Sequence, residues 1–214
     1  MNLLAIDTCG ALGSVALARL DADLAILGQT EIPGKTYSAQ LVPAIRDLLT
    51  HHNITLPNLD AIVVTNGPGS FTGIRIGLST AKGLAEAHSI PLLAVSRLAV
   101  LAHKAQAPAG ALDASRHEFY LREAAGEGLL ALEALRERAA VLGPGLTVCE
   151  SFVHAIAPDA TLVDPPTSID AISCALPRFQ KRDFDDPLTL DGNYLRRSDA
   201  EIFSKPALAG AREP

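Results

Sequence analysis

A glycine-rich segment is the part of this sequence best suited to bind an anion. Residues 66–73, with the sequence NGPGSFTG, follow the β-branched run Ala61–Thr65 and precede a helical pattern over Ile74–His88. Glycines in such a turn leave backbone N–H groups free, and the N-terminus of a helix attracts negative charge. The candidates for contact with a phosphate or a nucleotide are Gly69, Ser70, Thr72 and Arg75.

The same segment has a purely structural alternative. It is not a P-loop, because no G-x-x-x-x-G-K-[ST] pattern is present. Ser70 or Thr72 could instead cap the following helix, while the glycines only satisfy the backbone torsion angles of a tight turn. Arg75 opposes the helix dipole in the first turn, which favours an acidic residue or a phosphate as its partner.

Two aspartates each end a short apolar run. Asp7 closes Leu3–Asp7, and Asp113 closes Ala109–Asp113. A carboxylate at the end of a strand can orient a metal ion or a phosphate, and Asp7 joins the phosphate candidates for this reason. The alternative is that each side chain caps a turn, which is the commoner role of aspartate at such positions.

Other side chains with catalytic potential lack the spacing that chemistry needs. No two of the six histidines stand three to five positions apart, as helical metal ligands do. Ser70 is outside a G-x-S-x-G motif, so a nucleophile elbow is not indicated. The three cysteines lie far apart without CxxC spacing, which predicts reduced thiols, a cytoplasmic location and a small buried Cys9. We therefore predict no catalytic residue and no metal site.

Composition excludes several classes of protein. The chain has 214 residues, of which 48% are hydrophobic, so it folds into a packed globular structure. Lys and Arg total 18 against 24 Asp and Glu, giving a net charge of −6, which is unfavourable for binding nucleic acid without a partner. Apolar runs are as long as strands rather than membrane helices, and neither a leader nor a membrane contact is expected.

The pattern of the first half predicts strands followed by alternating helices and strands, an α/β lobe. Three short apolar runs, Leu3–Asp7, Ser14–Leu20 and Leu24–Ile32, favour an antiparallel meander. A helix over Ser38–His51 requires Pro43 to lie in its first turn. Further elements are the strand Ala61–Thr65, the helix Ile74–His88, the strand Pro91–Val95 and a helix from Ser96 to about Gln106.

The second half echoes the first faintly. The run Ala109–Asp113 and the strand Glu118–Glu123 repeat the opening, and Gly143–Gly145 repeats the Gly-Pro-Gly of the glycine-rich segment at a shorter distance. Pattern alone leaves a duplication open. The predicted domains are an N-terminal lobe over 1–106, a reduced C-terminal lobe over 107–205 with a late helix at Ile169–Gln180, and a frayed tail over 206–214.

The helix after the glycine-rich segment carries small residues on two faces. Gly77, Ala81 and Ala85 are spaced by four, and Gly73, Thr80 and Gly83 lie on neighbouring positions. Glycine costs about 1 kcal/mol relative to alanine inside a helix, so two glycines indicate close contact with another backbone. One face must pack on the protein's own sheet, and the other is predicted to dock a second subunit.

Three motifs together resemble the TsaB family. They are the sequence LAIDT at 4–8, GPGSFTGIRIG at 67–77 and YLR at 194–196, and the resemblance extends from Met1 to about Lys205. It implies an actin-like ATPase fold, related to Hsp70 and the sugar kinases, that is duplicated and has a reduced second lobe. Two positions depart from the family pattern, Tyr37 and Ser115.

The resemblance implies an accessory subunit without transfer chemistry of its own. Such a subunit pairs with a TsaD-type catalytic paralogue and a TsaE-type ATPase to form N6-threonylcarbamoyladenosine next to the anticodon of tRNAs that read codons beginning with A. It contacts tRNA mainly through the complex, and it leaves room for a homodimer when alone and for ATP or ADP at the junction with its partner. The name glycoprotease-like comes from the paralogue, and no peptidase activity is expected.

The family's subunit interface uses the helix near Ser38 and the helix after the glycine-rich segment. Carried over to this sequence, the interface residues are Tyr37, Leu41, Ile74, Gly77, Thr80, Ala81 and Leu84. The alternative function is a stand-alone phosphotransferase or ATPase of the actin-like fold, with Asp7 orienting a metal and the glycine-rich segment holding phosphate.

Overall fold

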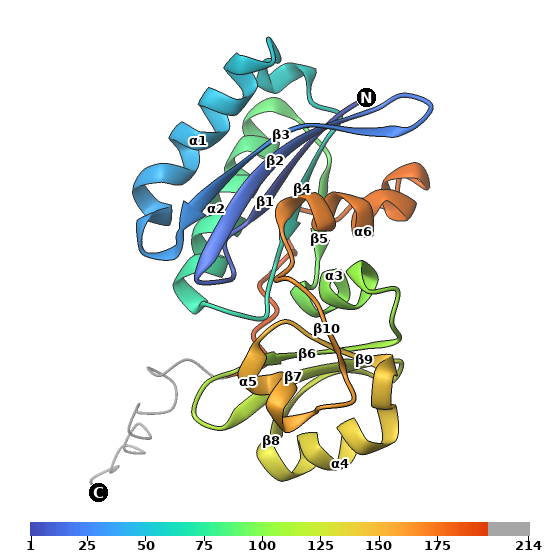
Figure 1. The fold of residues 1–214 in the computed structure, drawn as a ribbon. Coiled ribbons are helices and arrows are strands. Elements are labelled where there is room, and N and C mark those ends of the chain that lie inside the picture. The colour runs from blue at the N-terminus through green and yellow to red at the C-terminus, as the bar shows by residue number, and fades with distance from the viewer. Residues whose placement is uncertain (197–214) are drawn as a thin grey trace, which may run out of the picture.

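Two five-stranded sheets form the cores of two lobes, one above the other in Figure 1. The computed structural model describes residues 1–196. The predicted tail over 206–214 and residues 197–205 of the predicted second lobe lie outside the described residues.

The first sheet has the strand order β3-β2-β1-β4-β5. The first three strands form the predicted antiparallel meander, and β4 and β5 continue the sheet parallel to β1. All five residues of β4 are buried, which explains why that run has no polar alternation. The strands are β1 (Asn2–Asp7), β2 (Leu12–Leu20), β3 (Leu24–Pro33), β4 (Ala61–Thr65) and β5 (Leu92–Val95).

The second sheet repeats this topology. Its order β8-β7-β6-β9-β10 again combines an antiparallel meander with two parallel strands beside the first strand. The strands are β6 (Ala109–Asp113), β7 (Glu118–Glu123), β8 (Gly126–Ala131), β9 (Leu146–Val148) and β10 (Thr161–Leu162). The duplicated actin-like fold with a reduced second copy is therefore confirmed.

One sequence signal for the duplication was wrong. Gly67–Gly69 follows β4, whereas Gly143–Gly145 precedes β9, the strand that corresponds to β4. The two Gly-Pro-Gly turns thus lie at opposite ends of equivalent strands. A short turn motif recurs wherever the backbone must bend sharply, so it does not mark equivalent positions.

Helices cover both faces of each sheet. In the first lobe α1 and α2 pack on one face and α6 on the other, and in the second lobe α4 and α5 pack on one face and α3 on the other. The helices are α1 (Tyr37–His51), α2 (Phe71–His88), α3 (Arg97–Lys104), α4 (Leu132–Leu142), α5 (Ser151–Ile156) and α6 (Ser168–Gln180). Short 3-10 turns are η1 (Gly34–Thr36), η2 (Leu56–Asn58) and η3 (Gly143–Gly145).

Helices α3 and α6 pack against each other where the two lobes meet. Leu98 and Leu101 of α3 pack with Leu112 of the second lobe, and Ala171 and Ile172 of α6 pack in the core of the first sheet. The predicted division at 106/107 separates the two sheets but not these helices. The predicted second lobe was wrong to include α6, because the apolar face of that helix is buried against strands far from it in sequence.

Several element boundaries also differ from the predictions. Helix α2 begins at Phe71 rather than at Ile74, and Pro43 lies in the second turn of α1. The elements from β8 to β10 were not predicted. Besides helix α4, that part of the chain consists of short strands and short helices, and such elements give only a weak periodic pattern. None of the described helices is long and apolar enough to cross a membrane.

Candidate functional site

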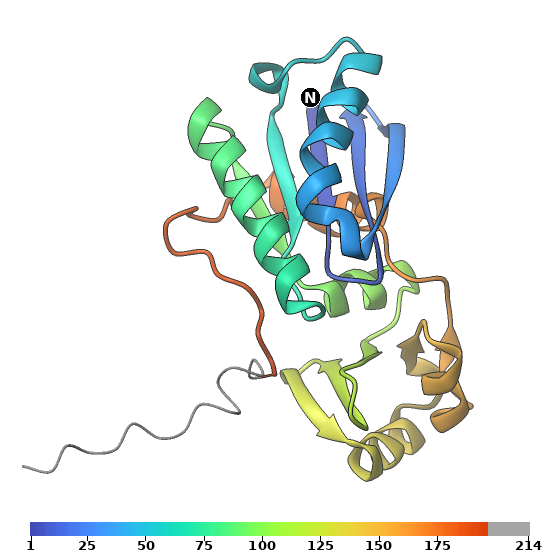
Figure 2. The same cartoon turned by 90° about the vertical axis from the view of Figure 1, so that its left-hand side faces the viewer.

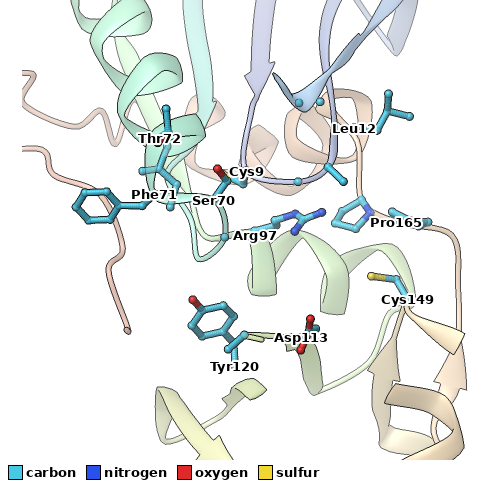
Figure 3. Close-up of a pocket in the computed structure, with 18 of the residues that line it drawn as sticks. Cys9, Leu12, Ser70, Phe71, Thr72, Arg97, Asp113, Tyr120, Cys149 and Pro165 are labelled. Atoms are coloured by element: carbon cyan, nitrogen blue, oxygen red, sulfur yellow. The ribbon is translucent and has the colours of Figure 1, made fainter. Parts of the chain in front are cut away.

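A cleft of about 1600 Å³ separates the two lobes. The first lobe contributes the β1–β2 turn and the N-terminus of α2, and the second lobe contributes the ends of β6 and β9. Figure 3 shows Arg97 between these two sets of residues, with Cys9 above it and Asp113 below it. The ends of the equivalent strands β1 and β6 therefore face the same cleft, in agreement with the duplicated topology.

The structure brings four of the five phosphate candidates to this cleft. Gly69, Ser70, Thr72 and Arg75 line it, whereas Asp7 is buried beneath it with 2% exposure. The Ser70 hydroxyl accepts a hydrogen bond from the Gly73 N–H (3.2 Å), which is the predicted cap of α2. Arg75 was expected to meet an acidic residue or a phosphate, but its guanidinium stacks on the Phe71 ring, 4.0 Å from the centroid.

The two strand-end aspartates cap turns. The Asp7 carboxylate accepts a hydrogen bond from the Cys9 N–H (2.9 Å), and the Asp113 carboxylate accepts one from the Ser115 N–H (2.8 Å). The same turn thus occurs at the same place in both lobes. Of the two interpretations left open by the sequence, the turn-capping role is the one that the geometry displays.

Arg97 lies at the centre of the cleft floor (Figure 3). It is the first residue of α3, and its backbone N–H donates to the Gly67 carbonyl oxygen (2.6 Å). The guanidinium lies against Gly10, where a Cβ atom would come within 2.6 Å of Nη2. Its Nε atom is buried and has no hydrogen-bond partner among the described residues.

Carboxylates from both lobes supply the charge that surrounds Arg97. Burial raises the pKa of Asp7 in the first lobe and of Glu150 in the second, and the Arg97 guanidinium partly offsets both effects. These carboxylates in turn raise the pKa of Arg97, although its own burial acts in the opposite direction. The cleft floor therefore combines the buried acidic groups Asp7 and Glu150 with the Arg97 guanidinium between the two lobes.

Neither thiol near the cleft is a nucleophile at neutral pH. Burial raises the pKa of Cys9 well above its usual value and that of Cys149 to about 12. The Cys9 thiol donates a hydrogen bond to the Thr65 carbonyl oxygen (3.3 Å), which holds it in its protonated form. Among the described residues no group of three or more His, Cys, Asp or Glu side chains could hold a metal ion.

The high pKa of Cys149 predicts slow alkylation. At pH 8 the native thiol should react with iodoacetamide at least about a hundredfold more slowly than the same thiol in urea, because only the thiolate attacks. Mass spectrometry of tryptic peptides after timed quenching gives both rates. Equal rates in the native and the unfolded chain would contradict the assigned environment.

Many residues of the cleft were not singled out from the sequence, among them Arg97, Tyr120, Cys149 and Glu150. A signal existed for Arg97, because a cation in the first turn of a helix is as unfavourable there as at Arg75. Cys149 and Glu150 follow a strand of only three residues, β9, and nothing in the local pattern distinguishes them.

Most residues of the predicted subunit interface lie inside the chain's own core. Five of the seven are buried in the first core: Tyr37, Leu41, Ile74, Gly77 and Ala81. Thr80 and Leu84 are half-buried, and Leu84 packs against that core. The spacing correctly indicated a close approach, but the neighbour is the chain itself, since a Cβ at Gly73 or at Gly77 would overlap Thr8.

The exposed face of α2 lies on the other side of the helix. Its exposed residues are Thr72, Arg75, Ser79, Gly83, Glu86, Ala87 and His88. A Cβ at Gly83 would meet nothing within 4 Å, so this glycine does not serve the chain's own packing. Figure 2 shows α2 and α1 side by side on this side of the molecule.

Comparisons with known proteins agree on one family. The family model described as TsaD, tRNA N6-adenosine threonylcarbamoyltransferase, matches residues 30–159, more than half of the chain. Similar proteins include the tRNA threonylcarbamoyladenosine biosynthesis protein TsaB of Escherichia coli, 35% identical over 129 residues, and that of Bacillus subtilis, 41% identical over 102 residues. The chain belongs to the TsaB group of the TsaD family.

The extent of the similarity differs between relatives of this TsaB-family chain. The matched segments cover 58% of this chain and 54% of the E. coli protein, so the chain spans about half the length of the curated TsaB proteins. An uncharacterized protein of Mycobacterium tuberculosis is 30% identical over 204 residues, 94% of each chain. A Pseudomonas aeruginosa structure described as similar to peptidase YeaZ has a TM-score of 0.74 at 28% identity and covers 91% of this chain and 99% of its own.

The two departures from the TsaB pattern have different structural consequences. Tyr37 is 2% exposed, and its hydroxyl donates to the Gly10 carbonyl oxygen (2.9 Å), so it ties α1 to the β1–β2 turn. Ser115 is exposed and has a left-handed backbone with φ of 63°. Tyr37 is thus part of the core, whereas Ser115 lies at the rim of the cleft.

Proposed function

We propose that this chain is an accessory subunit in the formation of N6-threonylcarbamoyladenosine on tRNA. Support comes from the relatives described as tRNA threonylcarbamoyladenosine biosynthesis protein TsaB. The observation that carries the non-catalytic part of the proposal is the cleft floor, where Arg97 lies between carboxylates of both lobes and both nearby thiols are protonated. In this floor the two thiols are held protonated and the Asp7 carboxylate is buried and hydrogen-bonded, so none of these three groups is placed to act as an open nucleophile or base.

The proposed partners are a TsaD-type catalytic subunit and a TsaE-type ATPase. Contact with tRNA then occurs mainly through the complex, in agreement with the net charge of −6. The chain works in the cytoplasm with its tRNA substrate, forms a homodimer when alone, has no peptidase activity, and leaves ATP or ADP to the junction with its partner. The exposed face of α2 replaces the buried residues as the proposed interface.

A stand-alone phosphotransferase or ATPase is less favoured. That function needs Asp7 to reach a metal ion in the cleft, but the Asp7 carboxylate is 2% exposed and accepts a hydrogen bond from Cys9. Arg97 lines the cleft and interacts electrostatically with Asp7, and its positive charge there repels a metal ion.

Reconstitution tests the proposed function. The chain is mixed with a TsaD-type subunit, a TsaE-type ATPase, the threonylcarbamoyl donor and tRNA, and the modified nucleoside is measured by mass spectrometry. We expect modification only when the chain is present, and no ATP turnover by the chain alone. Full modification without the chain would contradict an accessory role, and ATP turnover that is lost in Asp7→Ala would favour the enzyme.

A surface variant tests the proposed interface. Ser79→Arg places a long cation on the exposed face of α2 and should weaken binding to the TsaD-type subunit at least tenfold, which corresponds to about 1.4 kcal/mol. Val141→Arg, on the exposed face of α4, is the matched control and should leave the affinity unchanged. Calorimetric titration measures both, and equal affinities in the two variants would remove α2 from the interface.

A further inference from the structure

The chain crosses between the two lobes for a third time near its described end. After α6, residues 185–196, here called the strap, run beside α2 and reach β8 (Figure 2). The other two crossings, at 105–108 and 163–167, lie beside α3 and α6 on the opposite side of the cleft. The cleft is therefore bounded by chain on both sides.

The beginning of the strap is fixed to the first lobe. The Asp185 N–H donates to the Leu92 carbonyl oxygen (2.9 Å), and the Asp185 carboxylate accepts from the Ala94 N–H (2.7 Å). Further along, Lys82 of α2 donates to the Leu190 carbonyl oxygen. These bonds join the strap to β5 and to α2, so its first half moves with the first lobe.

The four residues 193–196 contact both lobes at once. The backbone N–H of Asn193 donates to the Asn66 carbonyl oxygen (2.7 Å) in the first lobe, while its side-chain amide donates to Glu127 of β8 (2.6 Å) in the second. The Tyr194 ring lies 4.8 Å from the Phe71 ring at the start of α2. Leu195 packs in the second-lobe cluster with Leu112 and Tyr120.

Arg196 completes the attachment to the second lobe. Its Nη1 donates to the Ala114 carbonyl oxygen (2.6 Å), and its Nε lies 3.4 Å from a carboxylate oxygen of Glu118. Ala114 lies in the turn between β6 and β7 and lines the cleft, and Glu118 is the first residue of β7. The side chain is 17% exposed, so the ion pair is partly shielded from water.

We propose that the strap is a brace that sets how far the two lobes open. The lobes are joined through α3 and α6 on one side, and lobes joined along one side alone are expected to swing about that side. Asn193 and Arg196 link the other side through hydrogen bonds to Glu127 and to the Ala114 carbonyl oxygen, and Arg196 adds an ion pair with Glu118. The strap also contacts the first turn of α2, so the brace connects the opening of the cleft to the exposed helix beside it.

Distance measurements between the lobes test the brace. Spin labels are carried on unnatural residues at the exposed positions Gln40 in α1 and Arg136 in α4, which leaves the three native cysteines in place. In a variant with Asn193→Ala and Arg196→Ala, electron–electron double resonance should show a shift to longer distances and a broader distribution. Faster hydrogen exchange at the residue 193 amide should accompany the shift.

Two further variants keep the test decisive. Asn193→Asp preserves the size of the side chain but places a carboxylate against Glu127, so it should open the lobes by repulsion. Arg138→Ala is the matched control, because it removes a guanidinium whose ion pair with Glu123 lies wholly within the second lobe. The proposal is overturned if the folded double variant and Asn193→Asp both retain the distance distribution of the Arg138→Ala control.

Discussion

Replacement of Gly77 by leucine is expected to unfold the first lobe rather than to remove a partner. A Cβ at Gly77 would overlap the Thr8 hydroxyl and lie 3.7 Å from Ile6, so a leucine side chain has no space between α2 and β1. Overpacking of this kind costs about 3 kcal/mol or more when backbone must move. The family resemblance placed Gly77 in the subunit interface, but this residue is buried against β1 and Thr8.

Gly83→Leu is the matched control in the same helix. Nothing lies within 4 Å of a Cβ at Gly83, and leucine has a higher helix propensity than glycine by nearly 1 kcal/mol. This variant should be at least as stable as the parent chain in urea-induced unfolding monitored by circular dichroism. If Gly77→Leu unfolded at the same urea concentration as Gly83→Leu, the packing of α2 on β1 would be wrong.

Arg97→Met should destabilise the protein strongly at neutral pH. The variant keeps a similar apolar side chain but removes the charge that offsets the burial of Asp7 and Glu150. Two unit charges a few ångströms apart in a partly polar protein interior interact by several kcal/mol, and we expect a loss of about 2–3 kcal/mol at pH 7.

The effect of Arg97→Met should depend on pH in a defined direction. A carboxyl group whose pKa is higher in the folded state binds more protons when folded, so its contribution to stability is lost as pH rises through the folded pKa. Without Arg97 the pKa of Asp7 and of Glu150 rises further, which makes the loss large at pH 7 and smaller at pH 5. Urea unfolding at both values measures it.

The control for this charge is Arg46→Met in α1. Arg46 is 70% exposed in its ion pair with Asp47, so its removal should change stability by no more than about 0.5 kcal/mol at either pH. A pH-independent loss in Arg97→Met would show that packing, and not the charge near Asp7, explains the effect.

The elements were predictable wherever the pattern was strong and local. The meander β1–β3, the buried strand β4 and the helix α6 follow from apolar runs and from helical spacing. The region from β8 to β10 was not predictable in the same way, because β9 and β10 have only three and two residues. Such strands hold their place through the sheet beside them rather than through their own composition.

The candidate site was predictable only in part, for the same reason. The glycine-rich segment was correctly located at the edge of a cleft, and the cap of α2 by Ser70 was among the interpretations open from sequence. Arg97 was not singled out, since its importance depends on Asp7 and Glu150, which lie 90 residues before it and 53 residues after it. Charges so far apart in sequence become neighbours only through the duplicated fold.

The sequence by itself determined the family, the α/β class and the local geometry of the turns and helices, because spacing and residue type act on the backbone over a few residues. Tertiary structure decided which face of α2 is covered, which helices pack together where the lobes meet and which residues each end of the strap contacts. Asn193 and Glu127 are 66 positions apart and yet share a hydrogen bond. Contacts of that kind depend on how separately formed elements pack together. The hydrophobic pattern of one helix or strand does not indicate which other element it will contact.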